Sequence, residues 1–371
     1  MTSARRHFET LLSHADIRLD GDRPWDIRVH NPETFRRTLV HGSLGFGEAY
    51  MDGWWDCDDL DEMLTRVFQA KLHEKVGRAS LVASAIKARA TNPWRRSKAH
   101  EIGEAHYDIG NDLYHAMLDS RMVYTCGYWK DAVTLDSAQE AKLDLVCRKI
   151  GLKQGMTVLD IGGGWGSFAK FAAEKYGAST VAITVSKEQV ALGRELCQGL
   201  PVDIRLQDYR DVEGSFDRVV SLGMFEHVGY KNYRAFMNVI HRVLKDNGLF
   251  LLHTIGANNS RTSNNPWIAK YIFPNSMLPS IAQIGRAIEK RFVMEDWHNF
   301  GYDYVTTLHA WYDNIEKAWE RLDASRYDER FRRMWRFYLL SSATTFRARN
   351  NQLWQIVLSK NGVDGGYAPV R

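Results

Sequence analysis

A glycine-rich loop that follows an apolar segment is the part of the chain best suited to chemistry. Residues 157–161 have the pattern of a buried parallel strand, and the loop after Asp160 has glycine at every second position, namely Gly162, Gly164 and Gly166. Glycine tolerates positive φ and lets a ligand lie against bare backbone. A helix that follows such a loop directs its free N–H groups at the ligand. The pattern therefore indicates a cofactor site, with a simple tight turn as the structural alternative.

The spacing of these glycines distinguishes between cofactors. Dinucleotide enzymes have the pattern Gly-x-Gly-x-x-Gly and an acidic residue about 20 residues further on. Here the third glycine comes one residue early, and the next predicted strand, 180–185, ends in Val-Ser rather than in an acid. A nicotinamide-dependent oxidoreductase is therefore disfavoured. The loop instead resembles motif I of the S-adenosylmethionine-dependent methyltransferases.

Polar side chains at the ends of the next strands could complete this site, because ligands of parallel sheets bind beyond the carboxyl ends of the strands. The second strand offers hydroxyls and an amide for ribose oxygens, and the third offers a carboxylate for an adenine amino group beside an aromatic ring. The candidates are Thr184, Ser186 and Gln189 on the second strand and Gln207, Asp208 and Tyr209 on the third. Structural alternatives are a helix cap for Asp208 and strand preference for Thr184. Matches at successive strand ends predict an S-adenosylmethionine site.

Hydrophobic periodicity predicts a β/α pattern from residue 100 onward. We expect an α/β fold, a Rossmann-like class I methyltransferase sheet with a smaller, mainly helical N-terminal domain. The predicted strands are 157–161, 180–185, 202–206, 216–221, 248–253, 292–297 and 353–359, and the predicted helices are 8–12, 60–68, 167–176, 187–197, 230–244, 304–322 and 328–346. A shift in composition divides the chain into a helical domain (1–90), a linker (91–100) and a catalytic domain (101–371).

The composition limits the class of protein. The 371 residues are 44% hydrophobic and 25% charged with a net charge of +4, as in a soluble globular protein with a mild basic bias. No run of about 18 apolar residues could span a membrane, and residues 1–12 lack the apolar part of a secretion signal. The 4 cysteines have neither metal-ligand nor disulfide spacing, so we expect no metal and a cytoplasmic location.

Longer motifs carry a specific resemblance. Nearly the whole chain resembles the cyclopropane-fatty-acyl-phospholipid synthases, and its catalytic part is similar to the enzymes that cyclopropanate mycolic acids. The motifs include Gly47-Glu-Ala-Tyr-Met-Asp-Gly-Trp-Trp, His106-Tyr-Asp-Ile-Gly-Asn-Asp, Tyr124-Thr-Cys-Gly-Tyr-Trp, Gln207-Asp-Tyr-Arg, Gly223-Met-Phe-Glu-His-Val-Gly, His253-Thr-Ile-Gly, Lys270-Tyr-Ile-Phe-Pro-Asn and Phe346-Arg-Ala-Arg. The resemblance implies an S-adenosylmethionine-dependent enzyme that adds a methylene group across a cis double bond of an unsaturated phospholipid acyl chain.

The resemblance also implies a bound bicarbonate ion as the base that removes a proton from the transferred methyl group. Its holders would be Cys126, Glu226, His253, the backbone at Ile255, and Tyr304. Tyr124 and Thr125 would contact the methionine end of the cofactor. Structural alternatives stay open, because Cys126 could be a small buried hydrophobe, His253 a satisfied core histidine and Tyr304 a helix-face aromatic.

Three positions depart from the family pattern. Thr125 replaces the usual serine and keeps its hydroxyl, while Gly163 replaces a loop cysteine and keeps the turn. Ser342 stands where some members carry a cysteine once considered catalytic. If the resemblance holds, that cysteine is dispensable.

The substrate implied by the resemblance lies in a bilayer, so we expect the protein to dock peripherally on the inner face of the membrane. Basic residues near anionic lipid and apolar loops would both favour docking. The candidate contacts are residues 93–98, 272–279 and 330–336. No nucleic-acid-binding signature is present. Family members of this length resemble homodimers, so a homodimer is a further expectation.

Two other functions remain open. An S-adenosylmethionine-dependent C-methyltransferase that makes methyl-branched lipids would share the cofactor site but lack the base. The joint presence of Cys126, Glu226, His253 and Tyr304 favours ring closure over that alternative. A non-catalytic nucleic-acid or lipid-binding module on the same scaffold is disfavoured, because the basic residues are dispersed and the pocket chemistry is retained.

Overall fold

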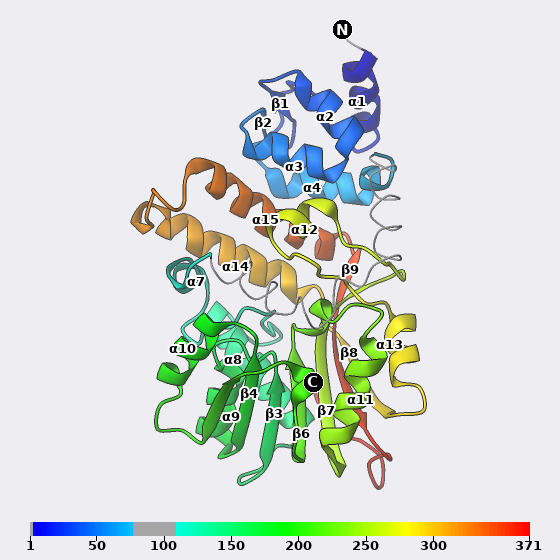
Figure 1. Ribbon diagram of the computed structural model, residues 1–371. Coiled ribbons are helices and arrows are strands. Elements are labelled where there is room, and N and C mark those ends of the chain that lie inside the picture. Colours follow the sequence, from blue (N-terminus) through cyan, green and yellow to red (C-terminus); the bar gives the residue numbers. More distant parts are fainter. Residues whose placement is uncertain (1–2, 77–108) are drawn as a thin grey trace. The chain divides into compact units, whose positions relative to one another are not determined.

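The computed structural model describes residues 3–76 and 109–371, which form two compact units (Figure 1). The sheet unit comprises the described residues within 93–261, 275–304 and 352–371, and the helical unit those within 1–92, 262–274 and 305–351. The helical unit therefore takes two segments from the region 101–371 that we expected to form one catalytic domain. The expected linker, 91–100, lies outside the described residues.

The sheet unit is built on a sheet of 7 strands in the order β5-β4-β3-β6-β7-β9-β8. The strands are β3 (Thr157–Ile161), β4 (Ser179–Thr184), β5 (Val202–Leu206), β6 (Phe216–Leu222), β7 (Leu244–Ala257), β8 (Val293–Asn299) and β9 (Asn351–Ser359). Strands β3 to β7 pair in parallel, and β8 pairs with β9 antiparallel at one edge. The predicted fold class is confirmed, and each predicted strand is present within a few residues of its expected bounds.

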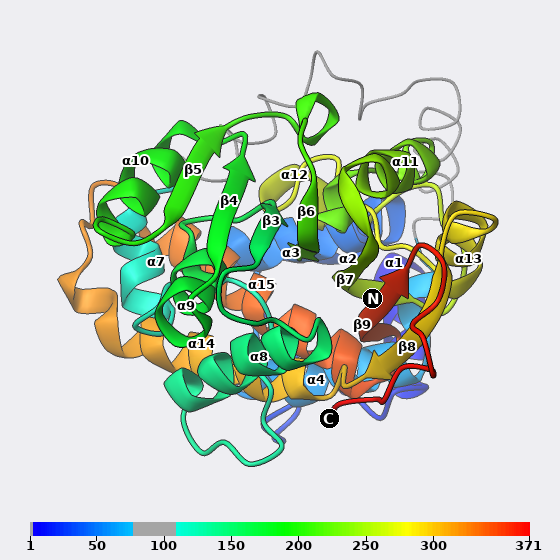
Figure 2. The ribbon, with the colours of Figure 1, turned by 90° about the horizontal axis from the view of Figure 1, so that it is seen from below.

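Helices cover both faces of this sheet, with α8 and α9 on one face and α11 and α13 on the other (Figure 2). Successive side chains of a strand point to opposite faces. Val158 accordingly packs with residues of α8 and α9, whereas Leu159 packs with residues of α11. The helices of this unit are α7 (Asn111–Met117), α8 (Leu135–Lys149), α9 (Ser167–Tyr176), α10 (Lys187–Leu196), α11 (Tyr233–Val243) and α13 (Ile281–Ile288), with short 3₁₀ turns η3 (Tyr209–Asp211) and η4 (Phe225–His227).

Local sequence explains where most of these helices begin. Ser186 caps α10 by accepting a hydrogen bond from the Gln189 N–H, and Thr134 caps α8 in the same way, each satisfying a free donor of the first turn. The helix predicted at 230–244 begins only at Tyr233, because η4 and the turn after it occupy the residues before.

The helical unit contains a short antiparallel pair of strands and helices from three parts of the chain. Its elements are α1 (Ser3–Ser13), β1 (Arg28–Val29), α2 (Glu33–His41), α3 (Ser43–Met51), β2 (Trp55–Asp56), α4 (Leu60–Gln69), η1 (Leu72–Glu74), α12 (Pro266–Tyr271), α14 (Asp303–Ala318, from its third residue), η5 (Trp319–Arg321) and α15 (Glu329–Arg347). A Cβ on Gly47 of α3 would lie 2.5 Å from the Trp267 indole of α12, so the glycine permits close packing. Within the described ranges, none of the helices combines the length and apolarity needed to cross a bilayer.

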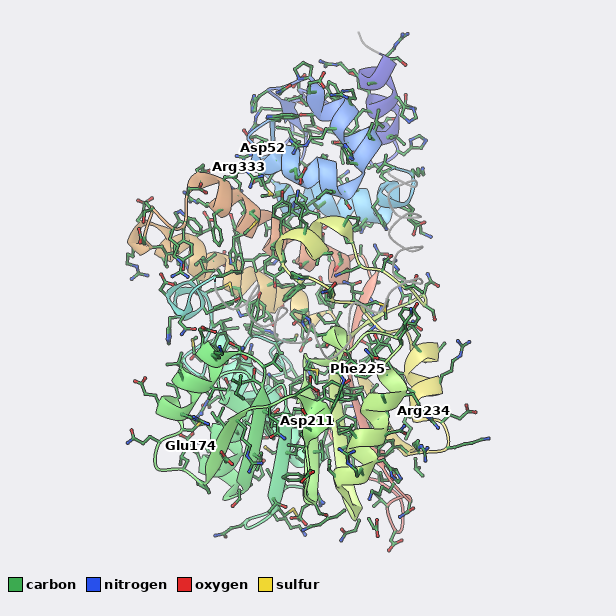
Figure 3. All side chains as sticks on the ribbon, in the orientation of Figure 1. Asp52, Glu174, Asp211, Phe225, Arg234 and Arg333 are labelled. Atoms are coloured by element: carbon green, nitrogen blue, oxygen red, sulfur yellow. The ribbon has the colours of Figure 1, made fainter. Side chains whose placement is uncertain are left out.

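Ion pairs join α15 to the N-terminal part of this unit. Arg333 donates to the Asp56 carboxylate at 2.6 Å and to the carbonyls of Tyr50 and Trp55. Arg330 pairs with Asp52 at 2.9 Å, and Figure 3 labels Asp52 and Arg333 in the helical unit. These contacts explain why residues 305–351 belong with the N-terminal segment rather than with the sheet.

The same contacts change the interpretation of residues 330–336, which we expected to offer a basic membrane-docking surface. Arg330 and Arg333 face the carboxylates just described, and Arg332 pairs with Glu316 at 2.7 Å. The positive charges of these three residues are therefore already compensated within the chain. The apolar segment 272–279 is likewise packed inward in part, because Met277 lies in the core of the sheet unit.

Replacing Arg333 with alanine should destabilise the protein by about 2–4 kcal/mol, because two carbonyls and a carboxylate lose a charged donor. Arg332→Ala, which removes a surface ion pair and a cation–π contact with Trp319 from the same helix, should cost about 1 kcal/mol or less. Chemical denaturation of both variants measures the difference. Equal destabilisation by the two substitutions would contradict the structural role of Arg333.

Candidate active site

The glycine loop after β3 has the geometry that its sequence predicts. Gly162, Gly164 and Gly166 all have positive φ, at 82°, 57° and 85°. The N–H groups of Gly162 and Gly163 donate to the Ile183 carbonyl at 2.9 and 3.0 Å, which ties the loop to the end of β4. A Cβ on Gly162 would lie 2.6 Å from the Met224 Cβ, so only glycine allows the loop to approach the segment after β6.

The predicted ribose-binding groups after β4 form a compact hydrogen-bonded cluster. Thr184 donates through Oγ1 to the Gln189 Oε1 at 2.6 Å, while Ser186 caps α10. All three side chains are buried. The Gln189 Nε2 lies 3.9 Å from the position of a Cβ on Gly164, so this amide faces the glycine loop. The structure therefore brings Gln189 and the loop together, as a shared ligand site requires.

The side chains after β5 make more contacts within the protein than we expected. Asp208 caps η3, accepting from the Arg210 N–H at 2.9 Å and from its guanidinium at 2.8 Å. The Tyr209 ring lies in the hydrophobic core against Phe236, with centroids 5.2 Å apart. Gln207 donates to the Asp211 carbonyl at 2.9 Å. The cap that the sequence offered as an alternative for Asp208 is thus present, and the adenine contact stays a prediction.

Aromatic rings connect the Tyr124–Cys126 segment to the glycine loop. The Tyr124 ring packs edge-on against Tyr114 of α7, and Tyr114 in turn contacts Trp165 inside the loop, each with centroids 5.1 Å apart. A Cβ on Gly223 would lie 2.7 Å from the Thr125 Cγ2, which places Thr125 beside the residues that lead to η4. Three predicted parts of the site therefore meet in the sheet unit.

Glu226 occupies a buried position in η4, directly after Phe225, which is labelled in Figure 3. Its Oε1 accepts from the Ile255 N–H at 2.7 Å. Its Oε2 is buried and has no hydrogen-bond partner among the residues that the structure describes. Burial raises the pKa of this carboxyl to about 7, although the Ile255 N–H acts in the opposite direction. The group can therefore hold or release a proton near neutral pH.

His253, two residues before Ile255 on β7, is also buried. The Gln355 Nε2 lies 3.3 Å from its Nδ1. With the amide in this orientation Nδ1 accepts, which leaves the proton of the neutral ring on Nε2. That Nε2 is buried and lacks a partner within the described part of the chain. Burial lowers the pKa of His253 well below its usual value, and the charges of Lys142 and Lys149 add to the effect. The imidazole is therefore neutral, and its Nε2 has no acceptor among the residues that the structure describes.

The two other predicted holders lie in the same unit. The Cys126 thiol is buried and donates to the Gly127 carbonyl at 3.2 Å. Tyr304 is buried in the first turn of α14, where the neighbouring Asp303 accepts from the Trp129 N–H at 2.7 Å. The start of α14 is thus tied to the segment that carries Cys126, which brings both residues to one region.

Several residues of this region were not identified from the sequence. The Phe300 ring packs against His253 at 5.9 Å and against Tyr128 at 5.3 Å, giving the site aromatic walls. Gln139 and Lys142 of α8 both hydrogen-bond Thr125. Their spacing, three residues apart among apolar neighbours of helix 135–149, is a signal that could have found them. The predicted motif at 106–108 and the docking segment 93–98 lie outside the described residues.

Asp160, at the end of β3, should make stability depend on pH. Its carboxyl is fully buried, and burial raises its pKa to about 7 against the opposing charge of Lys142. A carboxyl whose pKa is higher in the folded state stabilises the fold while protonated. That contribution is complete below about pH 4 and is lost as the pH rises through about 7.

We therefore expect the melting temperature to fall more steeply between about pH 5 and pH 8 in the unaltered protein than in Asp160→Asn, which cannot ionise. Glu226 contributes with the same sign, so some slope should remain. Asp203→Asn, on the exposed side of β5, serves as the control and should keep the full slope. If the melting temperature fell equally with pH in the unaltered protein and in Asp160→Asn, a protonated Asp160 in the folded state would be contradicted.

Comparison with known proteins places this site in a family. Residues 94–356 match the sequence profile described as mycolic acid cyclopropane synthetase. The cyclopropane-fatty-acyl-phospholipid synthase of Escherichia coli K12 is 52% identical over 362 residues, covering 97% of this chain and 94% of that protein. The tuberculostearic acid methyltransferase of Mycobacterium tuberculosis is 33% identical over 393 residues, covering 97% and 91%.

Among solved structures, the mycolic acid cyclopropane synthase CmaA1 complexed with SAH and CTAB is 31% identical. It has a TM-score of 0.65, and the match covers 70% of this chain and 98% of that one. Fold and site thus define a class I methyltransferase that depends on S-adenosylmethionine. The chain belongs to the mycolic acid cyclopropane synthetase family, which confirms the resemblance seen in its motifs.

Proposed function

We propose that this protein transfers a methylene group from S-adenosylmethionine to the cis double bond of unsaturated acyl chains in membrane phospholipids, forming a cyclopropane ring. The observation that carries the proposal is the buried pair Glu226 and His253, each with a polar atom that no described residue satisfies, next to the cofactor loop. The high identity to the Escherichia coli synthase over nearly the full chain supports the choice of substrate.

The chemistry makes three demands on this chain. The sulfonium supplies an electrophilic methyl group, and an alkene is a weak nucleophile, so the two must be held in line at near-attack distance. Breaking the S–CH₃ bond and forming the first C–C bond leaves a carbocation, which water would trap. Loss of a methyl proton to a base then lets the second C–C bond close the ring. The buried walls that Phe300 and Tyr128 provide fit the need for a dry, electron-rich pocket.

We further propose that a bicarbonate ion binds here, as the family resemblance implies. The residues present fit an acceptor anion, because His253 offers an Nε2–H donor and protonated Glu226 offers an O–H donor, both buried and otherwise unused within the described residues. When bound, bicarbonate would supply the base that accepts the methyl proton. Glu226, with a pKa of about 7, is suited to pass that proton onward. Cys126, the Ile255 backbone and Tyr304 would complete the cage.

The protein would reach its phospholipid substrate by docking peripherally on the inner face of the membrane. The location of the substrate and the net charge of +4 support such docking. The compensated arginines of α15 give it no support. The homodimer stays a prediction.

The test is to incubate the purified protein with S-adenosylmethionine and vesicles of unsaturated phospholipid, and to analyse the released fatty acids. The proposal expects products heavier by one CH₂ whose ring protons are visible by NMR. Unchanged lipids under conditions in which the Escherichia coli synthase is active would overturn the proposed function.

A second candidate is a C-methyltransferase that makes methyl-branched lipids. The full-length match to the tuberculostearic acid methyltransferase favours it, although at lower identity. A saturated methyl-branched product needs a reductant and gains two more hydrogen atoms than a cyclopropane, so mass spectrometry of the same samples separates the two functions.

A further inference from the structure

Helix α8 carries two lysines on its buried face. Lys142 and Lys149 are both completely inaccessible to solvent. Lysine is almost never fully buried unless it is paired, since removing an ammonium from water is costly. Lys149 follows this rule, because it lies 3.5 Å from the Asp296 carboxylate and 3.0 Å from the His298 Nδ1. Lys142 has no such ion pair within the described residues and therefore requires another explanation.

The contacts of Lys142 point to the active site. Its Nζ donates to the Thr125 Oγ1 at 2.6 Å. Two buried carboxylates, Asp119 and Asp160, are close enough to raise the pKa of Lys142, yet burial outweighs them and lowers it to about 8. Asp119 itself is occupied by the N–H groups of Val123 and Arg121. Among the described residues, Lys142 is thus a buried cation with one hydrogen bond and incomplete charge compensation.

Other hydrogen bonds also hold the segment that Lys142 contacts. Gln139, one turn earlier, already donates to the Thr125 carbonyl at 2.7 Å, and the Tyr128 N–H donates to the Ala138 carbonyl at 2.9 Å. These bonds hold the Tyr124–Tyr128 segment against α8. An apolar side chain of similar length at position 142 would avoid the desolvation cost altogether. The charge is therefore kept at a cost to stability.

The surroundings show where this charge acts. Lys142 lies within electrostatic range of Cys126, Asp160 and His253. Lys149, from the same helix face, also acts on His253. The Asp296 carboxylate compensates Lys149, whereas the charge of Lys142 is compensated only in part and lies near a neutral histidine. An anion bound there would complete the charge balance.

We propose that Lys142 is a positioning residue that fixes the Thr125 side chain and supplies the fixed positive charge for an anion held between Cys126 and His253. This inference rests on the proposed function, because bicarbonate is the anion that the reaction would use. It adds a residue outside the expected cage and explains why α8 buries a lysine that has no ion pair among the described residues.

The test compares Lys142→Met, which keeps the apolar stem and removes the charge, with Lys142→Gln, which keeps a donor for Thr125 but no charge. Arg148→Met removes an exposed cation from the same helix and serves as the matched control. Binding of ¹³C-labelled bicarbonate is followed by NMR line broadening, independently of activity. Cofactor binding, melting temperature and turnover at several bicarbonate concentrations complete the set.

Both Lys142 variants should bind bicarbonate about tenfold to a hundredfold more weakly, the range for loss of a bond to a charged group. Their melting temperatures should be equal to or above that of the unaltered protein. Their turnover should recover in part at high bicarbonate, and Arg148→Met should match the unaltered protein throughout.

Unchanged bicarbonate binding in Lys142→Met would overturn the inference, as would full restoration of binding by Lys142→Gln, since the charge would then be unnecessary. If the unaltered protein forms rings, and its Lys142 variants are equally active and bind bicarbonate normally, the inference is refuted and the proposed function stands. Charge-dependent bicarbonate binding by a protein that forms no ring product would support the inference and refute the proposed function.

Discussion

Replacing Glu226 with glutamine should lower turnover by about a hundredfold or more and leave cofactor binding nearly unchanged. Glutamine has the same shape and can still accept the Ile255 N–H through its carbonyl oxygen, so the buried 2.7 Å bond should survive. What is lost is the ability to take up and release a proton at the oxygen that no described residue engages. The substitution therefore tests proton transfer rather than structure.

The measurement is single-turnover methyl transfer to phospholipid vesicles, with S-adenosylmethionine affinity determined separately by calorimetry. The rate of the unaltered protein should also change with pH near 7, following the pKa of Glu226, and this limb should be absent in Glu226→Gln. Glu213→Gln, at an exposed position, is the control. A Glu226→Gln rate within a few-fold of the control would remove this carboxyl from the mechanism.

Gly162→Ala should weaken cofactor binding severely and destabilise the protein by about 2–5 kcal/mol. Two costs add up in this substitution. The positive φ of 82° costs an alanine about 1–2 kcal/mol, and the new methyl group would lie 2.6 Å from the Met224 Cβ, an overlap that costs about 1–3 kcal/mol more. Relief requires the loop to move away from the residues that lead to Glu226.

The matched control is Gly155→Ala, which has a similar φ of 78° but no atom within 4 Å of the added Cβ. It should show only the backbone cost and bind S-adenosylmethionine normally. Denaturation and calorimetric titration of both variants separate strain from overlap. If the two alanine variants lost the same stability and affinity, the close approach of the loop to Met224 would be irrelevant.

The elements that could be predicted from the sequence are those whose signals are local. Strand β3 and helix α9 have the expected bounds, because one ends in a glycine loop and the other begins there. The glycine spacing also predicted the three positive φ angles that the structure contains. Strand β7 extends four residues beyond its prediction at each end, since pairing partners rather than its own sequence determine its length.

The features that the sequence left undetermined depend mostly on partners far away in the sequence. Residues 330–336 looked like a free basic surface, and nothing local indicates that Asp52 and Asp56 neutralise Arg330 and Arg333. Lys142 was overlooked for a different reason, because a lysine in an amphipathic helix normally faces solvent. The roles of Glu226 and His253 came from the family resemblance, and the structure adds their burial and their unsatisfied atoms.

The discontinuous make-up of the helical unit has a consequence for biosynthesis. The carboxylates of α4, Asp61 and Glu62, pair with Arg347, which follows them by 286 and 285 residues. At ordinary ribosome speeds, the interval between their emergence is on the order of tens of seconds. The N-terminal helices must therefore wait, incompletely packed, until α15 has been synthesised, and a fragment that ends before α15 would expose that unfinished surface to chaperones and proteases.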